Sequence, residues 1–411
     1  MKLPRRHVLV QWLGASAWAT RPAWAQADHE QDGRLVFVFL RGAYDGLSML
    51  VPYADPHYKA LRPQIAIPAP DGSRRSALDL DGRFGLHPAC ADLLPLWQQG
   101  VLAAIVCAGS PDPTRSHFDA QYHWETGQPG RSRAADGWMN AACALTSKPT
   151  LAAALGVGES NPRILMGPQR VQLVASGPSA TRAGTLANAQ TRQAMQALYA
   201  SNAQLSEALS LGVDSRLQTA KTLSAADMAQ QEQRMANNGA AAAQGLALDA
   251  RHLGTLMNNN RALRCGFLSS DGWDTHINQG GVTGALANNL GHLSRALTEL
   301  RQAFNGPRDV VVVASEFGRT CAENGTRGTD HGHGNVMWLM GSAVQGGRCH
   351  GRWQGLAPAF LNQNRDLPVH HDFRAVLAQA LVKSQGLSPV QVATVFPGYA
   401  WDSEMDGLFR A

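Results

Sequence analysis

The chain has 411 residues and a formal net charge of +5, with 36 lysines and arginines against 31 aspartates and glutamates. Four of the basic residues and none of the acidic ones lie in the first 25 positions, so the rest of the chain has a net charge near +1. This near-neutral chain lacks the strong positive charge typical of proteins that bind nucleic acids or anionic membrane surfaces. We therefore expect no nucleic-acid partner.

The N-terminal segment has the pattern of an export signal. Residues 1–10 are basic and include the pair Arg5 and Arg6, a weakly apolar stretch follows, and residues 23–25 read Ala-Trp-Ala. This order predicts a signal peptide over residues 1–25, and the arginine pair favours the twin-arginine export machinery as a partner. No later segment is long and apolar enough to predict stable membrane insertion. We expect a periplasmic or secreted protein.

Residues 26–411 predict a single α/β domain. Uninterrupted apolar runs are typical of buried parallel strands, and apolar residues at helical spacing predict amphipathic helices. In chain order, we expect a strand at 34–40, a helix at 88–99, a strand at 101–107, a helix at 116–125, strands at 163–166, 171–175 and 264–269, a helix at 289–304, strands at 310–314 and 335–340, and a helix at 372–381. The first strand, helix and strand indicate a βαβ unit. The predicted fold is a mostly parallel sheet sandwiched by helices.

A segment of different composition interrupts this pattern at about residues 186–257. It is rich in Ala, Gln, Asn and Ser and has only scattered Leu and Met. This composition favours helices of modest hydrophobicity. We predict a helical insertion or cap over the sheet, which would contribute to substrate specificity.

Side chains with hydroxyl, carboxylate or imidazole groups follow four of the predicted strands. In an open α/β sheet, ligands bind beyond the carboxyl ends of the strands, so these side chains are expected to converge. They are Asp45, Ser116 with His117, Asp274 with His276, and Glu316 followed by Asp330, His331 and His333. The last three lie in a Gly-rich loop whose flanking Cys321 and Cys349 could form a disulfide in an oxidising compartment.

A mixed set of carboxylates and imidazoles of this size is typical of a hydrolytic centre with one or two divalent metal ions. Such ions hold the attacking and leaving oxygens and lower the pKa of the nucleophile. Zinc or manganese fits the set best, with iron or calcium as alternatives. The proposed metal ligands are Asp45, Asp274, His276, Glu316, Asp330, His331 and His333.

Ser116 has two compatible interpretations. It can be the N-cap of the helix that follows, or a nucleophile at a helix N-terminus, where the backbone amides favour an anion. Arg115 and Arg319 are candidates for binding an oxyanion substrate, because a guanidinium group matches phosphate or sulfate oxygens. Either arginine could instead form a structural ion pair.

Together these motifs resemble one known family. They are the twin-arginine leader, residues 39–46, Arg115-Ser-His-Phe118, Asp274-Thr-His276, Ser315-Glu-Phe-Gly-Arg-Thr320 and Gly328-Thr-Asp-His-Gly332. The set is similar to the DUF1501 family, exported bacterial proteins placed near the alkaline phosphatase and sulfatase superfamily. The resemblance covers nearly the whole mature chain and implies an alkaline-phosphatase-like α/β fold with a divalent-metal centre.

The resemblance also implies roles for individual residues. Asp45 corresponds to an early metal ligand and Ser116 to the nucleophile. Asp274 and His276 correspond to one metal subsite, whose late third ligand is His331.

Two features differ from the superfamily pattern. A single residue separates Asp274 from His276 where three are usual, and Glu316-Phe317 replaces an Asp-His pair of the second subsite. His333 or Asp330 could supply the missing ligand, or the site could hold one metal.

These features lead to three functional hypotheses. The first is an exported, metal-dependent hydrolase of phosphate or sulfate esters, with a small molecule or a glycan as substrate. The second is a metal-binding or scaffold protein that has the fold but no turnover. The third is different chemistry on an exported glycan or peptide. A protein that has lost turnover would tend to lose the nucleophile, so the presence of Ser116 favours the first hypothesis, a hydrolase.

Overall fold

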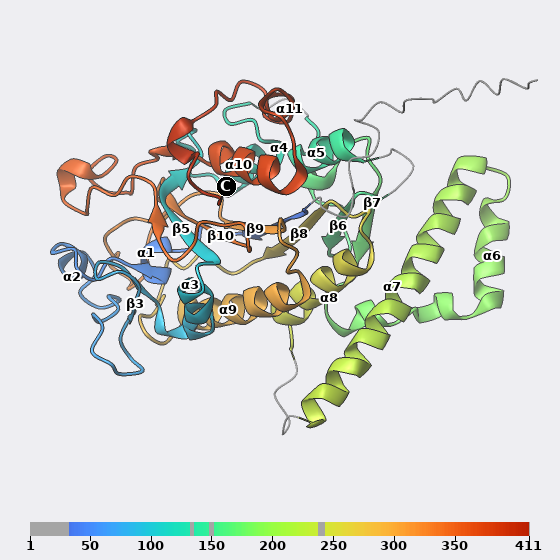
Figure 1. Ribbon diagram of the computed structural model, residues 1–411, viewed down its shortest axis with the longest axis horizontal. Helices are drawn as coiled ribbons and strands as arrows, with labels where there is room; N and C mark the ends of the chain where they lie inside the picture. The colour runs from blue at the N-terminus through green and yellow to red at the C-terminus, as the bar shows by residue number, and fades with distance from the viewer. Residues whose placement is uncertain (1–32, 132–134, 148–151, 237–242, 411) are drawn as a thin grey trace, which may run out of the picture. The chain divides into compact units, whose positions relative to one another are not determined.

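A nine-stranded sheet lies at the centre of the computed structural model, which describes residues 33–131, 135–147, 152–236 and 243–410 (Figure 1). The strands, in their order of pairing, are β11 (Cys349–His350), β5 (Leu102–Gly109), β10 (Asn335–Met340), β9 (Val310–Ala314), β1 (Leu35–Leu40), β8 (Cys265–Ser270), β6 (Ala154–Val157) and β7 (Val171–Val174), while β12 (His371–Asp372) also pairs with β5. Among these described strands, β10 alone pairs antiparallel to both of its neighbours. The prediction of a largely parallel sheet is confirmed.

The helices of the described residues are α1 (Gly46–Met49), α2 (Tyr58–Leu61), α3 (Leu94–Gln98), α4 (His117–Thr126), α5 (Trp138–Thr146), α6 (Ala189–Tyr199), α7 (Ala203–Ala236), α8 (Leu246–Asn259), α9 (Ala285–Ala303), α10 (Phe373–Gln385) and α11 (Pro389–Val395). A small antiparallel sheet contains β2 (Leu50–Val51), β4 (Gly85–Leu86) and β3 (Leu78–Asp79). Short 3₁₀ helices complete the regular structure, including η1 (Pro88–Leu93) directly before α3 and η2 (Arg163–Leu165).

Successive side chains of the central strands point to opposite faces of the sheet, and each face forms its own apolar layer. In β1, Leu35, Phe37 and Phe39 belong to a cluster that includes residues of α4, α5, α10 and α11. The intervening Val36 and Val38 belong to a second cluster with residues of α3, α8 and α9. Because successive strand residues point to opposite faces, each face of the sheet is covered by its own helices (Figure 1). The predicted helix–sheet–helix sandwich is therefore present.

The described parts of the segment at 186–257 are largely helical, as the composition predicts, and its helices have different surroundings. Helices α6 and α7 pack on each other, and α7 also contacts α8 and the edge strand β7. The last helix, α8, buries Leu253 and Met257 in the layer that it shares with α9. It is therefore part of the core, and the inserted helices proper are α6 and α7.

The structure also decides three further points, of which one is a correction. The strand predicted at 163–166 is wrong, because Arg163–Leu165 form η2, in which the Ile164 amide donates to the buried Glu125 carboxylate. The strand of this region is β6, which the sequence pattern does not indicate. The strands of the predicted βαβ unit, β1 and β5, belong to one sheet, with β9 and β10 between them. Cys321 and Cys349 are free thiols, so they do not form a disulfide.

The predicted signal peptide, residues 1–25, lies outside the described residues. Within the described part of the chain, no helix combines the length and hydrophobicity needed to cross a bilayer.

A buried ion pair connects the starts of β1 and β9. Arg34 donates from Nε and Nη2 to the two carboxylate oxygens of Asp309, and from Nη1 to the carbonyl of Met257. Both charged side chains are almost fully buried. Removing one partner of such a pair leaves the other charge without compensation.

We predict that Asp309→Ala lowers the free energy of unfolding by about 3–5 kcal/mol, because it leaves the buried Arg34 guanidinium unpaired. The matched control is Glu404→Ala, which removes an ion pair with Arg352 whose side chains are 54% and 53% exposed. This control should change the free energy by about 0–1 kcal/mol. Urea unfolding followed by circular dichroism measures both. Equal losses would contradict a special role for the buried pair.

Candidate metal centre

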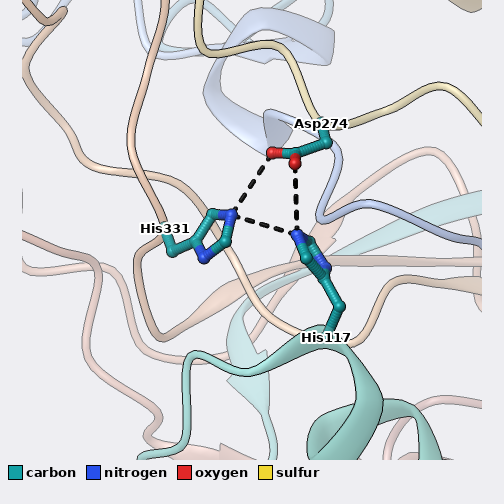
Figure 2. Close-up of side chains that lie close together, drawn as sticks. All are labelled: His117, Asp274 and His331. Atoms are coloured by element: carbon teal, nitrogen blue, oxygen red, sulfur yellow. Dashed lines mark hydrogen bonds and ion pairs between the residues drawn. The ribbon is translucent and has the colours of Figure 1, made fainter.

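Four side chains, from the start of one helix and from two loops, converge at the carboxyl edge of the sheet. His117 is the first residue of α4, which follows β5. Asp274 and His276 lie in the loop after β8, and His331 lies in the loop between β9 and β10. Figure 2 shows His117, Asp274 and His331 pointing toward one another. The predicted convergence of strand-end side chains therefore holds for these residues.

The contacts among the four side chains are short. The Nε2 atom of His331 lies 3.0 Å from Nε2 of His117, 3.0 Å from Nε2 of His276 and 3.3 Å from Oδ1 of Asp274. Asp274 Oδ1 is also 3.0 Å from His276 Nε2, and its Oδ2 is 3.4 Å from His117 Nε2. The ligand atoms of His117, Asp274 and His331 lie within 4.8 Å of one another, and His276 Nε2 adjoins two of these groups, His331 and Asp274.

The hydrogen-bond partner of each Nδ1 atom determines whether the Nε2 atom of the same ring carries a proton or a free lone pair. His117 Nδ1 lies 2.8 Å from Oε1 of Glu316, His276 Nδ1 lies 3.0 Å from Oδ1 of Asp330, and His331 Nδ1 lies 2.9 Å from the carbonyl oxygen of Arg115. These partners are a carbonyl and two carboxylates, so we assign an Nδ1–H donor to each ring. Each neutral ring then directs the lone pair of Nε2 toward the neighbouring ligand atoms.

This arrangement fits a metal ion. The lone pair of His331 Nε2 lies 3.0 Å from those of His117 and His276, and such lone pairs repel one another unless a cation lies between them. Histidine ligands also characteristically donate their other ring N–H to a carboxylate or carbonyl. Donor atoms about 2.1 Å from one metal lie about 3.0 Å apart at right angles and about 3.4 Å apart in a tetrahedron. The separations among His117, Asp274 and His331, and those of His276 from His331 and from Asp274, are 3.0–3.4 Å and cover this range.

The electrostatics of two ligands favour the metal-binding forms. Burial and the positive charges of His117 and Arg319 lower the pKa of His331, which keeps this ring neutral. Burial alone would raise the pKa of Asp274, but the hydrogen bond and charge of Arg319 lower it below its usual range. The hydrogen bond to Glu316 has the opposite effect on His117, because it raises the pKa of this ring. A proton on His117 therefore competes with a metal.

Glu316 lies behind His117 and does not belong to the ligand group. Its carboxylate is fully buried and accepts hydrogen bonds from the amides of Gly42 and Ala43 and from Gln121 and His117. Burial alone would raise the pKa of this group, but the hydrogen bonds from His117 and Gln121 lower it. The prediction of Glu316 as a metal ligand is corrected to a group that orients His117.

Arg319 also has a different task from the predicted one. Its guanidinium group is buried and donates to the carbonyls of Ala43, Gly42, Trp273 and Thr329 and, at 2.5 Å, to Asp274 Oδ1. These contacts occupy the donors that an oxyanion substrate would need. Arg319 therefore holds the Asp274 carboxylate in place and does not face a substrate.

Three predicted ligands lie outside the group. Asp45 is buried against Arg62, with contacts of 2.6 and 3.0 Å, because a carboxylate at full burial needs a charged partner. His333 places Nε2 3.0 Å from the carbonyl of Ser110. Asp330 accepts from His276 and supports that ligand from behind.

The two remaining predicted residues lie next to the ligands in the chain. Ser116 is the N-cap of α4, and its Oγ accepts a long hydrogen bond of 3.4 Å from the Asp119 amide. Arg115 forms an ion pair of 2.7 Å with Asp366 and offers its carbonyl to His331.

His117 is the ligand that the sequence interpretation missed. The sequence pattern groups it with Ser116 but assigns it no metal-binding role. The available signal is its position directly after an N-cap at a strand end, where a side chain faces the same edge as Asp274 and His331. The hydrogen bond to Glu316, which selects His117 over the neighbouring polar residues, is a tertiary contact.

The chain was compared with known proteins. Residues 102–395 match the family described as "Protein of unknown function (DUF1501)". No curated protein matches the chain. A solved structure, the crystal structure of Ps i-CgsB in complex with k-i-k-neocarrahexaose, has 10% sequence identity and a TM-score of 0.37, and the alignment covers 88% of this chain and 74% of that chain. The family match spans more than half of the sequence and includes all four clustered side chains, so the protein belongs to the DUF1501 family.

Proposed function

We propose that the protein is an exported, metal-dependent hydrolase of phosphate or sulfate esters on an alkaline-phosphatase-like fold. The observation that carries the proposal is the convergence of three Nε2 atoms and the Asp274 carboxylate, with each ring oriented by a partner at Nδ1. Three imidazoles and one carboxylate suit zinc best, with manganese or iron as alternatives. The export signal and the fold type rest on the sequence motifs.

The proposal includes one metal ion and not two. Phe317 occupies the position next to Glu316 where a second subsite would need an imidazole. Its buried ring packs on His117 at 4.9 Å and on His331 at 5.0 Å between centroids. A phenyl ring offers no lone pair, so this side of the centre is an apolar wall. The buried Asp45 is already paired with Arg62 and is not a second-site ligand.

A divalent cation in this centre would supply Lewis acidity, which stabilises negative charge on an ester oxygen and makes a nearby hydroxyl more acidic. The chain's own groups have separate roles. Glu316 and Asp330 orient their histidines, and Arg319 fixes Asp274. The Asp274 side chain is 43% exposed, so the centre is open to solvent on one side and a substrate can approach.

Ser116 is the proposed nucleophile. It directly precedes the ligand His117, and its hydroxyl makes only the long N-cap contact to Asp119. At the start of α4 the free backbone amides favour the negative charge that develops during attack on phosphorus or sulfur. Arg115, whose side chain remains 32% exposed beside its ion pair with Asp366, is the proposed oxyanion-binding group.

We predict that His331→Ala abolishes metal binding, because it removes the nitrogen that contacts the other three donor groups. The matched control is His333→Ala, two residues away, whose ring contacts the carbonyl of Ser110. Elemental mass spectrometry of both purified variants measures metal per chain. We expect about one equivalent of transition metal in the wild type and in the control, and none in His331→Ala. Equal metal content in the two variants would exclude the proposed ligand set.

We predict that Ser116→Ala keeps its metal and loses hydrolysis of 4-nitrophenyl phosphate or 4-nitrophenyl sulfate by at least about a thousandfold in kcat, the scale of removing a nucleophile. Loss of an N-cap is controlled by Ser388→Ala, because Ser388 caps α11 through a capping box. That variant should lose stability but not turnover. Wild-type turnover in Ser116→Ala would refute the nucleophile. Bound metal without hydrolysis of any ester by the wild type would favour the non-catalytic alternative.

A further inference from the structure

A buried amide connects the two loops that carry three of the four proposed ligands. Gln279 is fully buried, and its Oε1 accepts from Thr275 Oγ1 at 2.9 Å and from Thr329 Oγ1 at 2.8 Å. Thr275 lies between Asp274 and His276, and Thr329 lies two residues before His331. One carboxamide oxygen therefore contacts the loop after β8 and the loop before β10 at the same time.

The other end of this amide is fixed by a buried ion pair. Gln279 Nε2 donates to Asp45 Oδ2 at 2.7 Å, and Asp45 accepts from Arg62 at 2.6 and 3.0 Å. Arg62 also donates to the carbonyls of Thr320 and Cys321, which lie in the same loop as His331, between β9 and β10. A carboxylate can only accept here, so it permits one orientation of the amide, with the oxygen toward the two threonines.

The two loops also touch directly. The Thr329 amide donates to the Thr275 carbonyl at 3.2 Å. At Gly328, an added Cβ would lie 2.2 Å from the carbonyl oxygen of His276, so the backbones leave no room for a side chain. The separation of the loops, and with it the distance between His276 and His331, depends on contacts that Gln279 completes.

We infer that Gln279 is a positioning residue, which holds the Asp274-His276 loop and the His331 loop at the separation that a metal requires. The inference deepens the proposed function and rests on it. In this arrangement the buried Asp45–Arg62 pair supports the centre through Gln279, although neither residue contacts the proposed ligands. The network is fully satisfied, and networks of this kind rigidify the elements that they join.

The test compares Gln279→Met with Gln385→Met. Gln385 is also a buried glutamine, but its amide contacts Thr146 and the start of β8 at Arg264 and Cys265, the end of the strand opposite the loop that carries Asp274 and His276. Both substitutions remove a buried amide of the same size, so both should reduce stability. Zinc affinity is measured by competition with a chelator, and hydrogen exchange is measured on the metal-free proteins.

We expect Gln279→Met to weaken zinc binding by about tenfold or more, the scale of losing a group that orients metal ligands, and Gln385→Met to leave it unchanged. In metal-free protein, exchange should become faster at residues 274–280 and 326–331 in Gln279→Met only. Unchanged exchange there, or equal effects of the two variants, would overturn the inference. If the wild type binds no zinc, the proposed function fails, and the exchange result still decides whether Gln279 fixes the loops.

Discussion

The orientation of three imidazole rings is the constraint on which the rest of the site depends. Each ring has a hydrogen-bond acceptor at Nδ1, and each Nε2 therefore turns toward Asp274. The Nε2 atom of His331 lies 3.0 Å from Nε2 of His117 and of His276, and lone pairs on nitrogens this close repel one another unless a cation lies between them. The acceptors at the three Nδ1 atoms are the Glu316 carboxylate, the Asp330 carboxylate and the Arg115 carbonyl, and they fix this orientation.

The fold supplies these supports at one edge of the sheet. Parallel strands end together there, and the antiparallel β10 starts at the same edge, so the long loop after β9 returns to the site from which it leaves. Buried charged side chains then hold the ligand-bearing segments in position. Glu316 holds His117, and Arg319 joins Asp274 to the loop after β1. The structure is consistent with a site whose rigidity comes from paired charges beneath it.

Much of this architecture could be predicted from local pattern. The valine run of β9 and the apolar run of β1 identify central strands, and polar residues after strand ends identify Asp274, His276 and His331. The same pattern cannot separate a ligand from its support. Asp45 and Glu316 carry ligand-type groups, but full burial requires them to pair with Arg62 and with His117 and backbone amides. These pairings join residues far apart in the chain, which a local pattern does not contain.

Anomalous scattering from crystals of the zinc-loaded protein tests the central claim most directly. The account predicts one peak per chain, about 2.1 Å from the Nε2 atoms of His117, His276 and His331 and from an oxygen of Asp274. A second peak near Phe317 would contradict the single-metal centre. A peak at Asp45 or His333, or no peak among the three rings, would show that the convergent lone pairs do not form a metal site.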